Sequence, residues 1–546
     1  MTSPTLYADI LRHAQKRPTA IAAYDSERAI RYADFAADID IVSRRLASLH
    51  LVPDGLAAIC LQQPYLHWVV LIALWRHGIM SITANIPAVV QSLPHFGTRV
   101  IFADNDDVPD FDARRINVDA SWLQTDDSLP AFNEPVLAPV HGLRLVLSSG
   151  TTGTAKQVIL TRAVLDARLD RVRRNPRFDT SIVFRSLVSV ASVEFLFAVG
   201  AWAAGGAVDF STEPLQDALA KGSLKANLVF MNTAQLCKLV NALPADAKPH
   251  RSLIVLAGGS IVPKEVSRKA HQRLAGMLMI LYGSTEAGIV AINPNPLEYA
   301  DPGVCGFVVP DMKVELINEA GHPVGAGATG EVRIHSTSCI SAFKDDADGT
   351  RDCFKDGWFY PGDLGKMSSN GVLSIVGRKD EMINIGGAKI APATIEHALL
   401  ACPGVKEVAA FTVPDADGVE RLWAAVVKDE GYAQDALEAA WARFDVAAWG
   451  RLNLIYFDAI PRNGMGKTMR PELVAAVKSH TPAKEALSTV NLNGEDIDVN
   501  RVSEAARATM ASLRLIDTEL QRLNQQKAAC NEALDRMLAD GSFLKQ

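Results

Sequence analysis

Short apolar runs that alternate with amphipathic segments constrain the fold of this chain more than any other feature. Apolar runs at 56–61 and 99–103 are separated by helical periodicity at 66–77. The same order returns later, with apolar runs at 227–230 and 252–257. Such alternation is typical of helices layered on a largely parallel sheet. We therefore predict an α/β protein.

The length of 546 residues is too great for one hydrophobic core and indicates several domains. Strand patterns at 313–318 and 330–336 predict a β-rich subdomain, and a compact α/β unit begins past Gly377. We expect a large N-terminal domain of layered sheets and helices over 1–377 and a small C-terminal α/β domain over 378–478. A helical tail is expected over 479–546.

The expected tail carries a heptad-like pattern. From Val502 to Met537, apolar residues recur at alternating steps of three and four, the spacing of a coiled coil. Thr509 and Lys527 interrupt this seam. Two interpretations stay open: the tail associates through 500–540 with a copy of itself or a partner, or it lies on its own chain.

Composition excludes several classes of function. The net charge is −7 with no basic block, so nucleic-acid binding has no electrostatic support. The seven cysteines form no C-x-x-C pair, which favours a reducing cytoplasm over a zinc site or a disulfide framework. The N-terminus lacks the apolar core of a signal peptide, and the apolar run at 68–75 has charged neighbours too close for a membrane span. We expect a cytoplasmic protein and read this run as a buried helix.

A loop rich in glycine and hydroxyls follows the apolar run at 143–147. Its glycines allow backbone N–H groups to approach an anion, and the hydroxyls and a lysine add donors and positive charge. A P-loop NTPase would need glycine before that lysine and a hydroxyl after it, but Ala155 and Gln157 stand there. We predict a different polyphosphate cradle, made by Ser148, Ser149, Gly150, Thr151, Thr152, Gly153 and Lys156.

Two further motifs suit a nucleotide. In the stretch 281–288, Tyr282 offers a flat face for a base, and Glu286 is a hard oxygen ligand for Mg²⁺. In the stretch 357–364, Asp363 follows a Pro-Gly turn, where a carboxylate suits the diol of a ribose. Each motif alone is also compatible with an ordinary turn.

Together with the stretches 377–396 and 460–470, these motifs resemble, in order, those of the adenylate-forming superfamily. That superfamily comprises acyl- and aryl-CoA synthetases, peptide-synthetase adenylation domains and luciferases. The resemblance covers about residues 20–475, and Pro361 departs from it where a small hydroxyl residue is usual. Besides the cradle, it implies nucleotide contacts from Gly258, Gly259, Ser260, Tyr282, Gly283, Ser284, Thr285, Asp363 and Arg378.

The resemblance also implies the remaining roles. Thr151 and Glu286 are expected to hold Mg²⁺ and, with Lys467, to assist catalysis. Asp380 is the expected hinge of a mobile small domain. Rotation about it would exchange Lys467 for a pantetheine tunnel bordered by Gly386, Gly387 and Ala388.

The expected acid pocket is uncharged. No aspartate stands near Ser189 to pair an α-amino group, which favours an aryl or short-to-medium acyl acid without a zwitterion. Glu194 is either an amine partner or, as we favour, a carboxylate at a helix start. The predicted pocket comprises Ser189, Val190, Ser192, Val193, Met231, Asn232, Gly258, Leu281, Gly283 and Ile289.

These expectations define an ATP-dependent ligase that converts a small carboxylic acid to acyl-AMP and then to a thioester. The thiol is CoA or the phosphopantetheine of a separate acyl carrier protein. A third alternative is a non-catalytic binder of acyl-adenylate.

Overall fold

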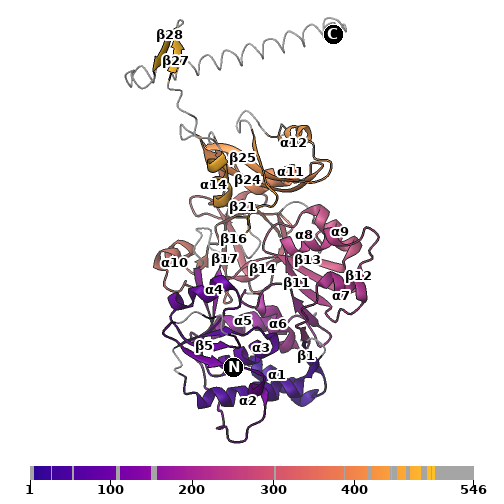
Figure 1. The fold of residues 1–546 in the computed structure, drawn as a ribbon, viewed down its shortest axis with the longest axis vertical. Helices are drawn as coiled ribbons and strands as arrows, with labels where there is room; N and C mark the ends of the chain where they lie inside the picture. The colour runs from indigo at the N-terminus through magenta and orange to yellow at the C-terminus, as the bar shows by residue number, and fades with distance from the viewer. Residues whose placement is uncertain are drawn as a thin grey trace. The chain divides into compact units, whose positions relative to one another are not determined.

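The computed structural model describes residues 5–498 except for 26–27, 52–54, 106–107, 109–110, 149–155, 177, 193, 300–302, 386–387, 416–419, 443, 445–451, 463–467, 481–488 and 493–494. The chain divides into two compact units, Met1–Leu473 and Val474–Gln546. The first unit alternates strands and helices (Figure 1), which confirms the predicted α/β class.

A six-stranded sheet occupies the N-terminal part of the first unit. All its neighbouring strands pair in parallel except the last pair. Its central strands β3 and β4 are buried along their whole length, since both faces are covered. In order across the sheet the strands are β6 (Arg114–Asn117), β5 (Thr98–Ala103), β3 (Leu56–Cys60), β4 (Ser81–Thr83), β7 (Gly142–Ser148) and β8 (Lys156–Thr161).

A larger sheet carries the candidate site. From β1 to β13 its strands are parallel, with β2 added antiparallel at the edge. These strands, in spatial order, are β2 (Arg28–Arg31), β1 (Ile21–Asp25), β10 (Ala207–Asp209), β9 (Val183–Ser186), β11 (Leu228–Asn232), β12 (His250–Gly258) and β13 (Ala275–Ser284).

Beyond β13 the same sheet becomes antiparallel, as the β-rich pattern of the sequence predicts. The carboxyl end of β13, the last parallel strand, therefore lies beside β14, the first antiparallel strand. The strands are β14 (Gly288–Asn293), β15 (Val304–Val308), β21 (Val372–Arg378), β20 (Asp363–Met367), β17 (Thr329–His335), β16 (Lys313–Ile317), β19 (Trp358–Phe359) and β18 (Phe354–Lys355).

Helices fill the space between the two sheets and cover the outer face of the larger one. A central apolar core joins five helices to both sheets: α1 (Leu6–Lys16), α2 (Tyr32–Ser48), α3 (Pro64–Arg76), α5 (Arg162–Arg173) and α6 (Phe195–Ala204). α3 is buried on all sides, which confirms the buried helix predicted for the run at 68–75. On the outer face of the larger sheet lie α7 (Leu215–Lys221), α8 (Thr233–Ala242) and α9 (Lys264–Arg273) (Figure 1).

Shorter helical segments connect these layers. They are α4 (Pro87–Ser92), α10 (Ala347–Cys353) and two 3₁₀ turns, η1 (Leu93–Phe96) and η2 (Ala120–Leu123). None of the helices in the described part of the chain has the length and apolarity needed to cross a membrane.

The C-terminal part of the first unit has a core of its own. It contains a hairpin and a three-stranded sheet, as the compact α/β pattern past Gly377 predicts. The elements are β22 (Ile383–Ile385), β23 (Ala388–Ile390), α11 (Pro392–Leu400), β24 (Val405–Pro414), β25 (Glu420–Lys428), α12 (Gln434–Trp441) and β26 (Asn453–Tyr456). α14 (Arg470–His480) begins in the first unit and continues into the second. The domain boundary at 377/378 stays a prediction.

The second unit differs from the helical tail expected over 479–546. Its described residues include an antiparallel hairpin of β27 (Thr489–Leu492) and β28 (Glu495–Asp498). The alternating apolar residues here suit a strand better than a helix, and the sequence between the strands is Asn-Gly, a pair that favours tight hairpins. The heptad positions from Val502 onward, and with them the predicted coiled coil, lie outside the described residues.

Candidate functional site

A continuous cleft of about 2860 Å³ lies at the carboxyl ends of β11, β12 and β13. The last residues of these strands, Asn232, Gly258 and Ser284, all line it. In α/β sheets this edge is where ligands bind, because parallel strands end there together. The cleft extends along β20 and β21, so residues from distant parts of the sequence share its wall.

A polar cluster links three of the predicted nucleotide residues. The hydroxyl of Tyr282 donates to Oδ2 of Asp363 at 2.6 Å, and Arg378 Nη1 lies 3.3 Å from Oδ1. Arg378 Nη1 also donates to the carbonyl of Pro361 at 2.7 Å. The Pro-Gly turn therefore supplies a backbone acceptor, and the departure at Pro361 leaves the carboxylate in place.

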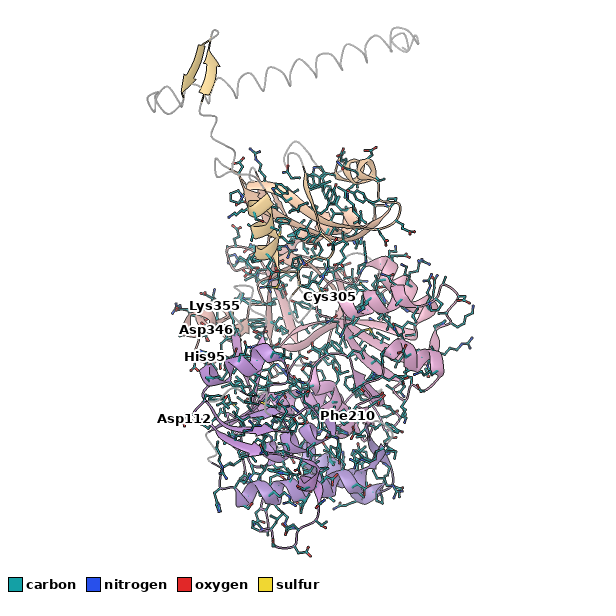
Figure 2. The ribbon with its side chains drawn as sticks, in the orientation of Figure 1. His95, Asp112, Phe210, Cys305, Asp346 and Lys355 are labelled. Atoms are coloured by element: carbon teal, nitrogen blue, oxygen red, sulfur yellow. The ribbon has the colours of Figure 1, made fainter. Side chains whose placement is uncertain are left out.

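Electrostatics keep this cluster in one protonation state. Burial, followed by the charge of Asp363, raises the pKa of Tyr282, so the phenol remains a donor. Burial opposes the charge of Arg378, but the carboxylates of Asp363 and Asp380 outweigh it and raise the pKa of Arg378. Burial also raises the pKa of Cys305, which lines the cleft (labelled in Figure 2), to about 12, so that thiol adds no charge.

Glu286 is held by its backbone. Its carbonyl accepts from Ile340 N and from Arg168 Nη2, both at 3.0 Å, and Nη2 also donates to the carbonyl of Thr285 at 3.0 Å. The Glu286 residue is 8% exposed and lines the cleft. The side chain of Arg168 thus fixes the segment that presents the carboxylate.

Arg168 escaped the sequence analysis. It lies on α5, within the run Arg162–Arg173, and its many charged neighbours suggest a solvated helix. Yet it falls four residues after Val164 and one before Leu169, on the buried face of that helix. Burial lowers its pKa to about 10, so the guanidinium remains charged at neutral pH. The sequence did contain a signal for Arg168, because its charge stands at a position where the helical periodicity predicts an apolar residue.

The phosphate loop is described only at its two ends. Ser148 ends β7 and Lys156 begins β8, both in the cleft wall. Lys156 Nζ lies 3.7 Å from Cys353 Sγ and 4.5 Å from the centre of the Phe343 ring. Ser149, Gly150, Thr151, Thr152, Gly153, Lys467, Gly386 and Gly387 lie outside the described residues, as does Val193.

Gly283, which was predicted as a nucleotide contact, also allows two strands to approach closely. A Cβ on Gly283 would lie 2.2 Å from the carbonyl oxygen of Gly288, across the β13–β14 pair. The glycine therefore permits strand pairing at a register shift. The other predicted nucleotide residues, Gly258, Gly259, Ser260 and Thr285, also line the cleft.

Most of the predicted acid pocket lies in the same wall. Alternation along β11 turns Phe230 and Asn232 toward the cleft and Met231 toward the core on the other face. Val190 is likewise absent from the lining, and its carbonyl accepts from Arg144 at 3.0 Å. The pocket residues that do line the cleft are Ser189, Ser192, Asn232, Gly258, Leu281, Gly283 and Ile289.

Of the expected hinge and tunnel residues, the structure describes Asp380 and Ala388. Asp380 lines the cleft and accepts from Arg378 Nε at 3.3 Å. Ala388 begins β23 of the hairpin.

The protein oxygens in the cleft suit a Mg²⁺ ion that takes most of its ligands from a bound phosphate group and water. The described residues contain no group of three side chains suited to hold a metal by themselves. Mg²⁺ commonly takes one or two carboxylates and completes its shell with phosphate oxygens and water. Glu286 provides such a carboxylate in the cleft.

Comparison with known proteins agrees with this geometry. The sequence profile described as "AMP-binding enzyme" matches residues 10–342, and that described as "AMP-binding enzyme C-terminal domain" matches residues 394–467. The chain is 30% identical to an indoleacetate–CoA ligase of Aromatoleum aromaticum over 389 residues, which are 67% of this chain and 73% of that protein. It is 28% identical to a long-chain-fatty-acid–CoA ligase of Escherichia coli O157:H7 over 358 residues, 63% of either protein.

A solved structure shares the fold. ATP-bound MatB from Rhodopseudomonas palustris superposes with a TM-score of 0.77 at 20% sequence identity. The match covers 87% of this chain and 99% of that one.

Proposed function

The chain belongs to the AMP-binding enzyme family, and from that premise we propose that it activates a carboxylic acid with ATP and transfers the acyl group to CoA. The acid is an aryl or a short-to-medium acyl acid. The indoleacetate and fatty-acid ligases to which the chain is similar support both the chemistry and the acid–thiol class.

The observation that carries this proposal is the polar cluster of Tyr282, Asp363 and Arg378 beside the carboxyl ends of the parallel strands. Tyr282 and Arg378 hold the carboxylate of Asp363 in the cleft wall, where it suits the two hydroxyls of a ribose. The flat face of Tyr282 then suits the adenine, and Gly258 and Gly259 leave room beside it.

The first step is attack on the α-phosphorus of ATP. An oxygen of the acid carboxylate forms the new P–O bond, and the bond to the bridging oxygen breaks, so pyrophosphate leaves with the electron pair. Lys156 and Lys467 disperse the negative charge that develops, and positioning supplies most of the acceleration. Glu286 and Thr151 would hold Mg²⁺, which neutralises phosphate charge when bound.

The second step is thiolysis of the acyl-AMP. The sulfur of CoA attacks the carbonyl carbon, the C–O bond to AMP breaks, and AMP leaves. In our proposal the small domain turns about Asp380 between the steps, withdraws Lys467 and brings the segment 386–388 to the thiol.

The test is a screen of pyrophosphate release with aryl and acyl acids, with and without CoA. We expect release that depends on one or more acids, with acyl-CoA formed when CoA is present. Asp363→Ala should lose at least about tenfold in kcat/KM, whereas Asp348→Ala, which removes an exposed ion pair with Arg351, should not.

Two outcomes would redirect the assignment. Pyrophosphate release without acyl-CoA, together with acylation of a phosphopantetheine carrier, would favour a carrier-loading enzyme. Binding of acyl-AMP without acid-dependent pyrophosphate release from any acid would favour a non-catalytic binder.

A further inference from the structure

A carboxylate with one unpaired oxygen lies in the wall of the acid pocket. Glu194 directly precedes α6 and lines the cleft. Its Oε2 atom is fully enclosed and has no hydrogen-bond partner among the described residues. The sequence favoured a helix-start role, but the side chain makes no capping hydrogen bond to the first turn of α6. Neither ion pairing nor helix capping therefore accounts for this oxygen.

The direction of the side chain follows from its helix. Glu194 lies three residues before Phe197, so the two side chains share one face of α6. The Phe197 ring stacks on Phe230 of β11 with centroids 5.4 Å apart. Phe230 is two residues before Asn232, at the carboxyl edge of the sheet. This face of α6 therefore points into the space between the helix and the site.

Much of the cleft wall that includes Glu194 is apolar. Its apolar residues include Leu196, Phe197, Leu228, Phe230, Ile254 and Met279. Within the described residues no Lys, Arg or His forms an ion pair with it. Burial raises the pKa of Glu194, although hydrogen bonds from Ser192 and from its own amide oppose this shift. An acceptor enclosed without a donor destabilises the free protein, so a ligand donor is its natural complement.

We propose that Glu194 is a specificity residue of the acid pocket, and that when an acid binds, its carboxylate turns toward the cleft and accepts a hydrogen bond from an N–H or O–H group on the body of the substrate. This rests on the proposed acid activation. The preferred acid then combines an apolar body with one donor, as in a hydroxyaryl, aminoaryl or ω-amino acid. The uncharged pocket expected from the sequence would have excluded an amine.

The test compares acids that differ only in the donor. Suitable pairs are 4-hydroxycinnamate with cinnamate, 4-aminobenzoate with benzoate, and 6-aminohexanoate with hexanoate. In the wild-type protein at least one pair should show a preference of about 10- to 100-fold in kcat/KM for the donor-bearing acid, the size of a hydrogen bond to a charged group. Glu194→Leu should reduce that preference to about twofold or less, through KM, and Glu265→Gln, on an exposed helix face, should leave it unchanged.

A preference that survives Glu194→Leu, or its absence from all pairs in the wild-type protein, overturns the inference. Calorimetric binding of the same acids separates it from the proposed function. If no acid releases pyrophosphate, the proposed activity fails, and a Glu194-dependent affinity difference still decides the inference.

The melting temperatures of two Glu194 variants test whether this residue has a structural role instead. Glu194→Leu and Glu194→Gln should melt at or above the wild-type temperature, because Glu194→Leu removes the unpaired acceptor and Glu194→Gln removes the charge that burial disfavours. A fall of several degrees in both variants would show that Glu194 holds the fold, and would contradict the proposal.

Discussion

Three charged residues give the cleft its chemical character. Asp363 is paired with Tyr282 and Arg378, and Arg168 holds the backbone at Glu286. Among the described residues, Oε2 of Glu194 and Nη1 of Arg168 have no hydrogen-bond partner. Motif order in the sequence was enough to predict Asp363 and Glu286. It was not enough for Arg168, because this residue donates to backbone carbonyls that come near it only when the chain folds.

Replacement of Arg168 by methionine tests this positioning role. The change removes the donor to the carbonyls of Thr285, Glu286 and Ser338. We expect a stability loss of about 3 kcal/mol, since buried acceptors lose their partner, and a larger fall in kcat than in affinity for the acid. Arg174→Met, which removes an exposed ion pair, should cost less than about 1 kcal/mol. Scanning calorimetry and pyrophosphate release measure both effects, and equal losses in the two variants would contradict the role of Arg168.

Glu194 also predicts a pH dependence of stability. Burial raises its pKa in the folded protein above the ordinary 4.5, so between these values the folded protein binds more protons than the unfolded chain. Its contribution to stability is present at low pH and is lost as the pH rises through the folded pKa. Glu194→Gln does not titrate there, so its melting temperature relative to wild type should rise from pH 4 to pH 8.

A control with the opposite sign exists. The side-chain hydrogen bond from Arg268 lowers the pKa of Glu265, so Glu265→Gln should lose a little relative stability over the same range, limited by solvent exposure. A difference between Glu194→Gln and wild type that stays constant with pH would contradict the burial argument.

At the scale of elements, amphipathic segments were predicted well and edge strands were not. The helical pattern at 233–242 coincides with α8. The stretch 104–142 was read as irregular, but it contains β6, a four-residue edge strand with one buried side chain. One buried residue gives no alternation to detect. The hairpin at 489–498 was missed because the tail was interpreted from its heptads alone.

The β13–β14 hairpin gives a prediction at this scale. Gly283→Ala would push a Cβ to 2.2 Å from the carbonyl of Gly288 and separate the two strands. We expect a lower melting temperature and a rise of about tenfold or more in the KM for ATP, because Tyr282 moves with the strand. Gly325→Ala, where a Cβ meets nothing within 4 Å, is the control. Unchanged ATP affinity in Gly283→Ala would show that nucleotide binding does not depend on the pairing of β13 with β14.

At the scale of the whole molecule, residues from Ser148 to Asp380 share one cleft although long stretches of sequence separate them. The order of motifs predicted this convergence through its resemblance to a known superfamily. The motifs themselves lie at different strand ends, since Ser148 ends β7, Ser284 ends β13 and Asp363 begins β20. The sequence could not predict which oxygen of Asp363 faces which partner, nor that Oε2 of Glu194 has no hydrogen-bond partner among the described residues, because both depend on packing between elements.

The proposed two-state mechanism predicts that Lys467→Ala impairs the first half-reaction and leaves the second intact. Formation of acyl-AMP should fall by about a hundredfold or more, because the mobile cation is lost, whereas thioester formation from supplied acyl-AMP should persist. Lys428→Ala, on the three-stranded sheet of the same domain, is the control. Half-reactions followed separately by mass spectrometry decide the matter, and equal loss of both would argue against an exchange of Lys467 for the 386–388 segment.

The central claim is that the acid carboxylate attacks the α-phosphorus of ATP. An acid labelled with ¹⁸O in its carboxylate, turned over with ATP and CoA, tests it directly. The account predicts one ¹⁸O atom in the AMP released, because the bridging oxygen of acyl-AMP stays with phosphorus when the thiol attacks carbon. Label found in inorganic phosphate, or AMP formed without label, would contradict it.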